Sequence, residues 1–210
     1  MKIGIIGSGN IGGTLGKHWA KAGHEVLFSS RHPEELNDLV RESEGNTKAV
    51  SVTDAFEANA DVYLLAMPFK EIDRTAELYA GEYGGKVIID ATNPYPERDG
   101  EMAQEVRDDN RNASEYTAMK FSTAFTAKAF NTIHAKDLKE RAFDSQNPMA
   151  VPYAAQNDKS RETTKTLISD IGFVPIYVGE LGETNAMEVD EKVYGVSTDQ
   201  QELRSMLNMP

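Results

Sequence analysis

A glycine-rich run near the start constrains the fold more than any other feature of the sequence. Gly7 to Gly12 follow a predicted strand and open a predicted helix, which is the context that a dinucleotide-binding fingerprint requires. In that geometry Gly7 permits a tight turn, Gly9 lets the backbone approach a pyrophosphate at the helix N-terminus, and Gly12 lets the helix pack closely on the strand. The alternative is a glycine turn that holds no ligand. The predicted cofactor-binding residues of this loop are Gly7, Ser8, Gly9, Asn10, Ile11 and Gly12.

Short apolar runs alternate with stretches of helical spacing, which is the pattern of a parallel sheet covered by helices. We therefore predict an α/β fold, a Rossmann-type doubly wound and mostly parallel sheet with a small C-terminal α/β extension. The predicted strands are Lys2–Ile6, Glu25–Phe28, Lys48–Val52, Val62–Ala66, Lys86–Asp90, Ala127–Phe130, Ala150–Ala154 and Val174–Val178. The predicted helices are Ile11–Ala22, Glu34–Glu42, Thr53–Ala58, Lys70–Tyr79, Glu115–Phe125 and Lys159–Ile171.

Three further features belong to this fold prediction. Trp19 lies on the apolar stripe of the first helix, and core packing is favoured there over stacking on a ligand. The polar stretch Pro96–Asn112 is expected to be a solvated surface excursion. The tail from Thr198 to Pro210 has few apolar residues and is expected to be a marginal or partner-dependent helix.

The residues after the second strand indicate which dinucleotide would bind. NAD sites carry an acidic residue there for the ribose 2′-hydroxyl, whereas this chain has Ser29, Ser30 and Arg31. Two hydroxyls and a guanidinium suit a 2′-phosphate, so NADP is favoured over NAD. Arg31 as an ordinary surface arginine is the alternative. Glu34 and Glu35 lie nearby and are expected to cap the following helix.

Charge and composition exclude several classes of function. The formal net charge of −12 repels phosphate backbones and anionic lipids, so neither nucleic acid nor membrane is an expected partner. The absence of cysteine excludes disulfides, thiolate nucleophiles and Cys-ligated metals. The four histidines are scattered and no carboxylates cluster at ligand spacing, so we predict no metal site. The first apolar run is too short for a signal peptide, and a cytoplasmic location is expected.

Several motifs taken together resemble a known family. Besides the glycine loop and Ser30-Arg31, they are Ala66-Met67-Pro68-Phe69, Asp90-Ala91-Thr92-Asn93-Pro94 and Lys128-Ala129-Phe130-Asn131-Thr132. In order and spacing they resemble the NADP oxidoreductases that depend on the deazaflavin coenzyme F420, through about Gly182. The run Lys-Ala-Phe-Asn is also similar to the cytosolic NADPH-binding domain of the transmembrane metalloreductases.

The resemblance implies roles for particular residues. Ser8 to Ile11 match the pyrophosphate loop, and Ser30 with Arg31 match the 2′-phosphate clamp. Met67 and Pro68 match the turn that runs beside the nicotinamide ribose, and Asn93 and Pro94 match the loop after the fifth strand; all four are predicted cofactor-binding residues. Asn131, Thr132 and Ile133 match the segment on which the deazaflavin rests, and together with His134 they are the predicted acceptor-binding residues.

This chain departs from the family pattern in two places. The deazaflavin enzymes have an imidazole at the position of Asn131, whereas this chain has the asparagine that is typical of the metalloreductases. The stretch Asn185–Leu207 is acidic, whereas the family has an apolar dimer-forming helix there. Residues 1–125 are expected to form the dinucleotide-binding Rossmann domain, and residues 126–210 a smaller extension that continues the sheet and completes the acceptor site. A homodimer is expected from the resemblance.

Hydride transfer between a nicotinamide and a flavin-like ring needs positioning more than a protein acid or base, so no catalytic side chain is predicted. Asp90, at the end of a buried strand, is expected to accept hydrogen bonds from its own loop rather than to act as an acid or base. His134 is expected to be a satisfied loop residue, although a role beside the acceptor stays open.

The leading functional hypothesis is an NADP(H)-dependent oxidoreductase that transfers hydride between NADPH and a small-molecule redox acceptor. The second substrate would be the deazaflavin coenzyme F420 or FMN. The alternatives are an NADPH-dependent ferric or flavin reductase and a non-catalytic NADP-binding sensor or scaffold. A hydroxyacid, imine or pyrroline reductase is disfavoured, because those enzymes need a further helical domain and only about thirty residues follow Val178.

Overall fold

One eight-stranded sheet runs through the whole chain. The computed structural model describes residues 1–109 and 112–210, and its strand order is β3-β2-β1-β4-β5-β6-β7-β8. The first six strands are mutually parallel, and β7 and β8 run in the opposite direction. This confirms the predicted Rossmann-type, mostly parallel sheet. The strands are β1 Lys2–Ile6, β2 Glu25–Ser30, β3 Asn46–Ser51, β4 Val62–Leu65, β5 Val87–Asp90, β6 Phe125–Ala129, β7 Ala150–Ala155 and β8 Val174–Gly179.

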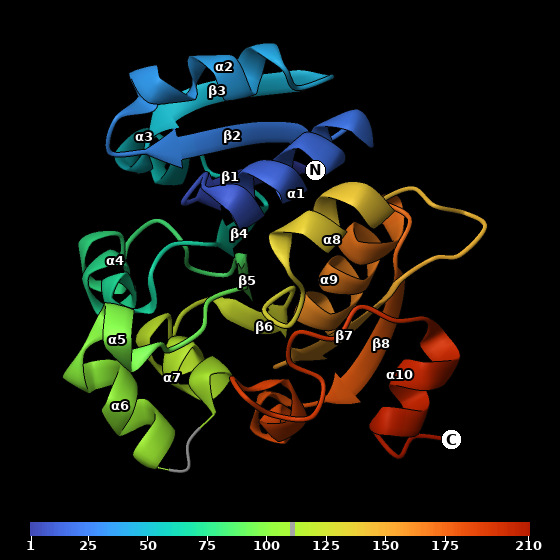
Figure 1. The fold of residues 1–210 in the computed structure, drawn as a ribbon. Coiled ribbons are helices and arrows are strands. Elements are labelled where there is room, and N and C mark those ends of the chain that lie inside the picture. Colours follow the sequence, from blue (N-terminus) through green and yellow to red (C-terminus); the bar gives the residue numbers. More distant parts are fainter. Residues whose placement is uncertain (110–111) are drawn as a thin grey trace.

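Helices cover both faces of this sheet, as the near-continuous apolar strands require (Figure 1). Alternate strand residues supply the two cores: Ile3 and Ile5 face a core shared with α1, α8 and α9, whereas Ile6 and Tyr63 face a core shared with α3, α4, α6 and α7. Trp19 is fully buried in the first core, as predicted. The helices are α1 Asn10–Lys21, α2 Asn37–Arg41, α3 Val52–Glu57, α4 Ile72–Leu78, α5 Pro96–Asp99, α6 Glu101–Asp108, α7 Ala113–Lys120, α8 Ala135–Arg141, α9 Asp158–Asp170 and α10 Gln200–Met206.

Two sequence-based expectations need correction, and one further helix was missed. The stretch Pro96–Asn112 is not a simple solvated excursion, because α5 and α6 form there and α6 buries Ala103 and Val106 in the second core; Arg111 lies outside the described residues. The helix expected to reach Phe125 ends at Lys120, since the chain must turn before β6 begins. Helix α8 was not predicted from the sequence.

The tail forms a small third core rather than an unanchored helix. Leu203 of α10 is buried with Met187 and Val193 against Ile176 of β8. The segment between β8 and α10 contains two 3₁₀ helices, η3 Leu181–Glu183 and η4 Asn185–Met187, and η3 contacts α7. In Figure 1 this orange-red segment turns back from β8 toward the green α7. Within the described residues, no helix combines the length and the apolar character needed to span a membrane.

Candidate functional site

The loop after β1 has the close contacts that its glycines permit. Gly7 has φ +99°, and a Cβ there would lie 2.8 Å from the Ala66 backbone. A Cβ on Gly12 would lie 2.1 Å from the carbonyl oxygen of Gly7, so the start of α1 is pressed against the loop. A Cβ on Gly9 would meet no atom within 4 Å. Gly9 is therefore the position at which a ligand can come close to the backbone.

The N-terminus of α1 is suited to an anion. Gly9 is its N-cap, no side chain caps the first turn, and that turn contains no acidic residue. The first backbone N–H groups of a helix lack partners inside the helix, and the helix dipole favours negative charge at this end. Asn10 is exposed here, and Ser8 Oγ donates to the carbonyl of Ser29 at 3.1 Å, which ties the loop to β2.

A first cavity, of about 450 Å³, opens between this loop and the ends of β2 and β4. Ser30 and Arg31 lie on one side of it, and Met67 and Pro68 lie on the other. Glu71 is the one acidic residue among those that line it. We call it the β2-side cavity. Its lining is Ile6, Gly7, Ser8, Gly9, Ser29, Ser30, Arg31, Leu36, Val52, Ala66, Met67, Pro68, Glu71 and Thr75.

The three residues expected at a 2′-phosphate differ in whether their polar side-chain atoms already have hydrogen-bond partners. Ser29 is fully buried and its hydroxyl donates to the Ile5 carbonyl at 2.7 Å, so that hydroxyl is already committed to the sheet. Ser30 Oγ accepts from the His32 backbone N–H at 3.1 Å. The Arg31 side chain is exposed, and no described residue bonds to its guanidinium. Arg31 is thus the group with the most unused donors at this cavity.

A second cavity, of about 170 Å³, lies where the loops after β5 and β6 meet the start of α1. It brings together Asn93 with the four residues expected at an acceptor, whereas Met67 and Pro68 line the other cavity and Pro94 lines a separate one beside α6. We call it the β5–β6 cavity. Its lining is Ile11, Ala91, Asn93, Tyr95, Phe130, Asn131, Thr132, Ile133, His134, Ala135, Tyr194 and Gly195.

Two asparagines join the loops that form the β5–β6 cavity. Asn131 Nδ2 donates to Asn93 Oδ1 at 3.1 Å and to the Met187 carbonyl at 2.9 Å. Asn93 Nδ2 donates in return to the Asn131 carbonyl at 2.8 Å. Gly195 N–H donates to the Thr132 carbonyl at 2.8 Å. The residues after β8 therefore hold this cavity together through backbone bonds.

Two tyrosines at this cavity were missed as site residues. The hydroxyls of Tyr95 and Tyr194 share a short hydrogen bond, and Asn93 Nδ2 donates to Tyr95 Oη at 3.3 Å. Tyr95 follows the Asn93-Pro94 motif and could have been included on that ground. Nothing in the sequence indicates that Tyr194, in the acidic stretch near the end of the chain, returns to the end of β5.

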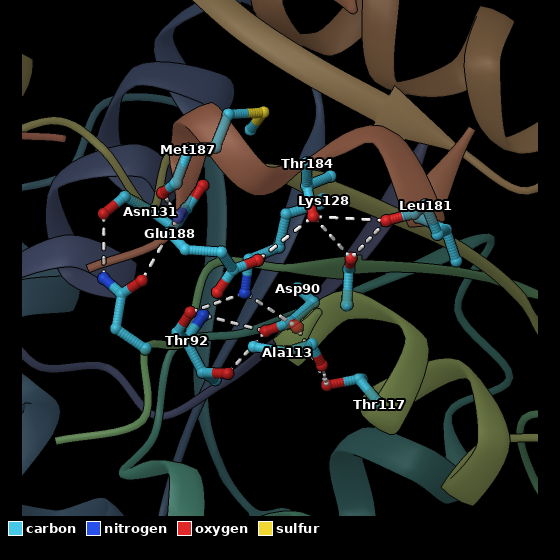
Figure 2. A network of polar contacts seen from close by, with 12 residues as sticks. Asp90, Thr92, Ala113, Thr117, Lys128, Asn131, Leu181, Thr184, Met187 and Glu188 are labelled. Carbon is cyan, nitrogen blue, oxygen red and sulfur yellow. Dashed lines mark hydrogen bonds and ion pairs between the residues drawn. The ribbon is translucent and has the colours of Figure 1, made fainter. Parts of the chain in front are cut away.

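A buried ion pair supports the two loops from below. Lys128 Nζ lies 3.0 Å from Asp90 Oδ2, with both side chains fully buried, and also donates to the Thr92 carbonyl at 2.6 Å. Asp90 accepts from the Thr92 N–H at 2.8 Å, as predicted, and from Thr117 at 2.8 Å. Figure 2 shows these side chains turned toward one another. Breaking such a buried pair costs several kcal/mol, so we expect it to fix the loop after β5 relative to β6.

Glu188 lies beside this ion pair. Burial raises the pKa of its carboxyl, although nearby Lys128 and hydrogen bonds from Thr184 and the Ala113 backbone oppose that shift. Thr184 Oγ1 donates to Glu188 Oε1 at 3.0 Å, and Ala113 is the first residue of α7. Figure 2 shows the segment that carries Thr184 and Glu188 lying over Asp90 and Lys128. The carboxyl therefore links the segment after β8 to the start of α7.

Comparison with known proteins identifies sequence relatives. Residues 2–94 match the family model described as NADP oxidoreductase coenzyme F420-dependent. Metalloreductase STEAP3 of Rattus norvegicus is 24% identical over 187 residues, which cover 89% of this chain and 36% of that protein. The chain thus spans about a third of the length of the curated relatives that it matches. Both resemblances inferred from the motifs are confirmed.

Solved structures share the fold. A hypothetical protein from Sinorhizobium meliloti has a TM-score of 0.82 at 24% identity, covering 95% of this chain and 96% of that one. A protein from Arthrobacter sp., described as a proposed F420-dependent NADP reductase, has a TM-score of 0.69 at 23% identity, covering 86% of each chain. At these identities the likeness confirms the architecture.

Proposed function

From the resemblance to the F420-dependent NADP oxidoreductases, we propose that this chain transfers hydride between NADP(H) and a deazaflavin or flavin-like acceptor. The observation that carries the proposal is the pair of cavities along the strand ends, the β2-side cavity and the β5–β6 cavity, on either side of the α1 N-terminus. Open parallel sheets bind ligands at the carboxyl ends of their strands. A dinucleotide that runs from one cavity to the other would have its pyrophosphate at Gly9.

We assign the β2-side cavity to NADP from its adenosine half as far as the nicotinamide ribose. Arg31 has free donors there and Ser30 lies next to it, which is the chemistry that a 2′-phosphate requires. Gly9 and the start of α1 would bind the pyrophosphate, and Met67 with Pro68 would lie beside the nicotinamide ribose. NADP supplies the hydride when it is bound in its reduced form. The residues named here bind and orient it.

We assign the β5–β6 cavity to the reacting rings. Asn93, Asn131 and Ile133 line it, and mostly backbone and uncharged side chains surround it, as suits a hydride transfer that depends on orientation and exclusion of water. The proposed division into residues 1–125 and 126–210 has a functional meaning here. The first part would bind the dinucleotide, and the second would supply Asn131 and Tyr194 to the acceptor side.

The direct test is anaerobic oxidation of NADPH by the purified protein. Oxidised coenzyme F420, FMN and a ferric chelate are offered in separate reactions, with NADH as the control donor. Turnover with coenzyme F420 or FMN, faster with NADPH than with NADH, is the expected result. Tight NADPH binding without turnover on any of the three acceptors would contradict a reductase and favour a binding protein.

The similarity to the metalloreductases gives the ferric chelate a specific purpose. This chain carries Asn131 in the run that it shares with them. Reduction of the ferric chelate without an added flavin would favour a ferric reductase over the function proposed here. A homodimer and a cytoplasmic location stay predictions.

A further inference from the structure

Two residues that line the β5–β6 cavity each have a buried polar atom whose hydrogen-bonding capacity is unused. Among the described residues, four buried side-chain oxygens lack a hydrogen-bond partner: Asn131 Oδ1 and Thr132 Oγ1 at this cavity, and Thr126 Oγ1 and Thr164 Oγ1 elsewhere. Asn131 is 5% exposed and Thr132 is 1% exposed. A buried polar atom without a partner costs free energy, and a bound water, ion or ligand that supplies the missing hydrogen bond is one way in which native proteins recover that cost.

The orientation of the Asn131 amide is fixed by its neighbours. Its Nδ2 donates to the Met187 carbonyl and to Asn93 Oδ1, and the Asn93 amide is fixed in turn because its Nδ2 donates to the Asn131 carbonyl. Turning either amide would place its oxygen against a carbonyl oxygen. The unpartnered atom at Asn131 is therefore an oxygen, and it requires an N–H or O–H donor from a ligand.

The tyrosine pair offers the opposite polarity. Two hydroxyls have two hydrogens, and the bond between Tyr95 and Tyr194 uses one of them. Either hydroxyl can be the donor in that bond, and Tyr95 Oη also accepts from Asn93, so one tyrosine hydrogen of the pair is left for a ligand. Burial and the bond to Tyr95 raise the pKa of Tyr194, so this hydroxyl stays protonated through the neutral range.

We propose that the β5–β6 cavity recognises an amide edge, a carbonyl and an N–H on neighbouring atoms, with the unused hydroxyl hydrogen of the Tyr95–Tyr194 pair donated to the carbonyl and Asn131 Oδ1 accepting from the N–H. The inference rests on the proposed function and deepens it, because two ligands of that reaction carry such an edge. One is the carboxamide of the nicotinamide, and the other is the cyclic imide of a flavin or deazaflavin ring.

The ligand-side test removes the N–H without changing the protein. FMN is compared with N3-methyl-FMN in the presence of saturating NADP, and NADP is compared with its 3-acetylpyridine analogue, by fluorescence titration. We expect one of the two modified ligands to bind about tenfold or more weakly, because Asn131 Oδ1 stays unpaired. Loss with N3-methyl-FMN identifies the acceptor ring as the source of the edge, and loss with the acetylpyridine analogue identifies the nicotinamide.

The protein-side test is a pair of variants, Tyr95→Phe and Tyr194→Phe. The variant that lacks the hydroxyl donating to the ligand should bind the ligand identified above about threefold to tenfold more weakly, the cost of one hydrogen bond. Tyr177→Phe is the matched control, since Tyr177 is a partly buried tyrosine on β8 that does not line the cavity, and it should bind as the wild type does. Circular dichroism and the melting temperature check that all three variants are folded.

The inference and the proposed function fail in distinguishable ways. Equal binding of both ligand pairs, together with unchanged binding by both Tyr95→Phe and Tyr194→Phe, would overturn the amide-edge inference even if NADPH turnover is rapid. Absence of turnover with every acceptor would contradict the oxidoreductase, while the NADP pair would still decide whether Asn131 recognises a carboxamide. If neither NADP nor FMN binds, both are overturned.

Discussion

Ser29 and Arg31, at the end of β2 and just after it, both line the β2-side cavity but differ in whether their side-chain donors are already hydrogen-bonded. The Ser29 hydroxyl bonds to the Ile5 carbonyl inside the sheet, whereas the Arg31 guanidinium is free of described partners. A 2′-phosphate would therefore be recognised by Arg31 with Ser30, and Ser29 would contribute little. Charge-assisted bonds from Arg to phosphate are about twice as strong as neutral ones, so the preference for NADP should depend on this one side chain.

Arg31→Ala should weaken NADPH binding by about 10- to 100-fold, the cost of losing hydrogen bonds to a charged group. NADH lacks the 2′-phosphate, so its affinity should change less than about twofold. Both are measured by fluorescence titration. Arg41→Ala, which removes an exposed arginine on α2, is the control and should leave both affinities unchanged. Equal loss for NADPH and NADH would remove the 2′-phosphate role from Arg31.

The sequence predicted residues best where backbone geometry dictates a residue type. Gly7 and Gly12 are such positions, because a side chain would collide with backbone atoms at either one. Tyr194 could not be predicted in this way. It reaches Tyr95, 99 positions earlier in the chain, through a tertiary contact that no local pattern records.

Among the elements, strands were predictable and short polar helices were not. Every strand, including β1 and β8, lies within two residues of its predicted bounds, since apolar runs bounded by turn residues are a strong local signal. Helix α6 buries only Ala103 and Val106, so its apolar face is too small to stand out among charged neighbours. Such helices are stabilised by tertiary packing rather than by local propensity.

The Glu188 carboxyl, which follows η4 and accepts a hydrogen bond from the start of α7, should make stability depend on pH. Its pKa is raised above the ordinary value of 4.5, so the folded state holds this proton more tightly than the unfolded state. As pH rises from about 4.5 through the folded pKa, the unfolded state binds fewer protons and the free energy of unfolding falls. Below that range the Glu188 carboxyl is protonated in both the folded and the unfolded state, so it adds no pH dependence to the free energy of unfolding.

Glu188→Gln keeps the shape of the side chain and cannot ionise. Urea unfolding across this pH range should therefore show the wild type losing more stability than the variant as the pH rises. Glu191→Gln, at an exposed carboxyl three positions further along, should follow the wild-type curve. Parallel curves for the wild type and Glu188→Gln would show that the Glu188 carboxyl ionises alike in the folded and unfolded states.

At the scale of the whole molecule, the two proposed parts share one sheet and one core. β5 and β6 pair across the proposed boundary at residue 125, and α9 packs on both strands. Trp19 of α1 donates from Nε1 to the Leu167 carbonyl at 2.9 Å and packs edge-on against Phe130. Residues 1–125 therefore bury their tryptophan with residues of 126–210, and the two proposed parts should unfold together.

Trp19 is the only tryptophan, so its fluorescence reports on this shared core. Urea unfolding followed by tryptophan fluorescence and by far-ultraviolet circular dichroism should give midpoints within about 0.2 M, as a two-state transition requires. Leu167→Ala keeps the carbonyl that Trp19 binds and opens a cavity at a fully buried position, which should lower the free energy of unfolding by about 2–5 kcal/mol. Both probes should shift together in this variant. A fluorescence transition that separates from the dichroism transition would show that residues 1–125 and 126–210 are independent folding units, despite the continuous sheet.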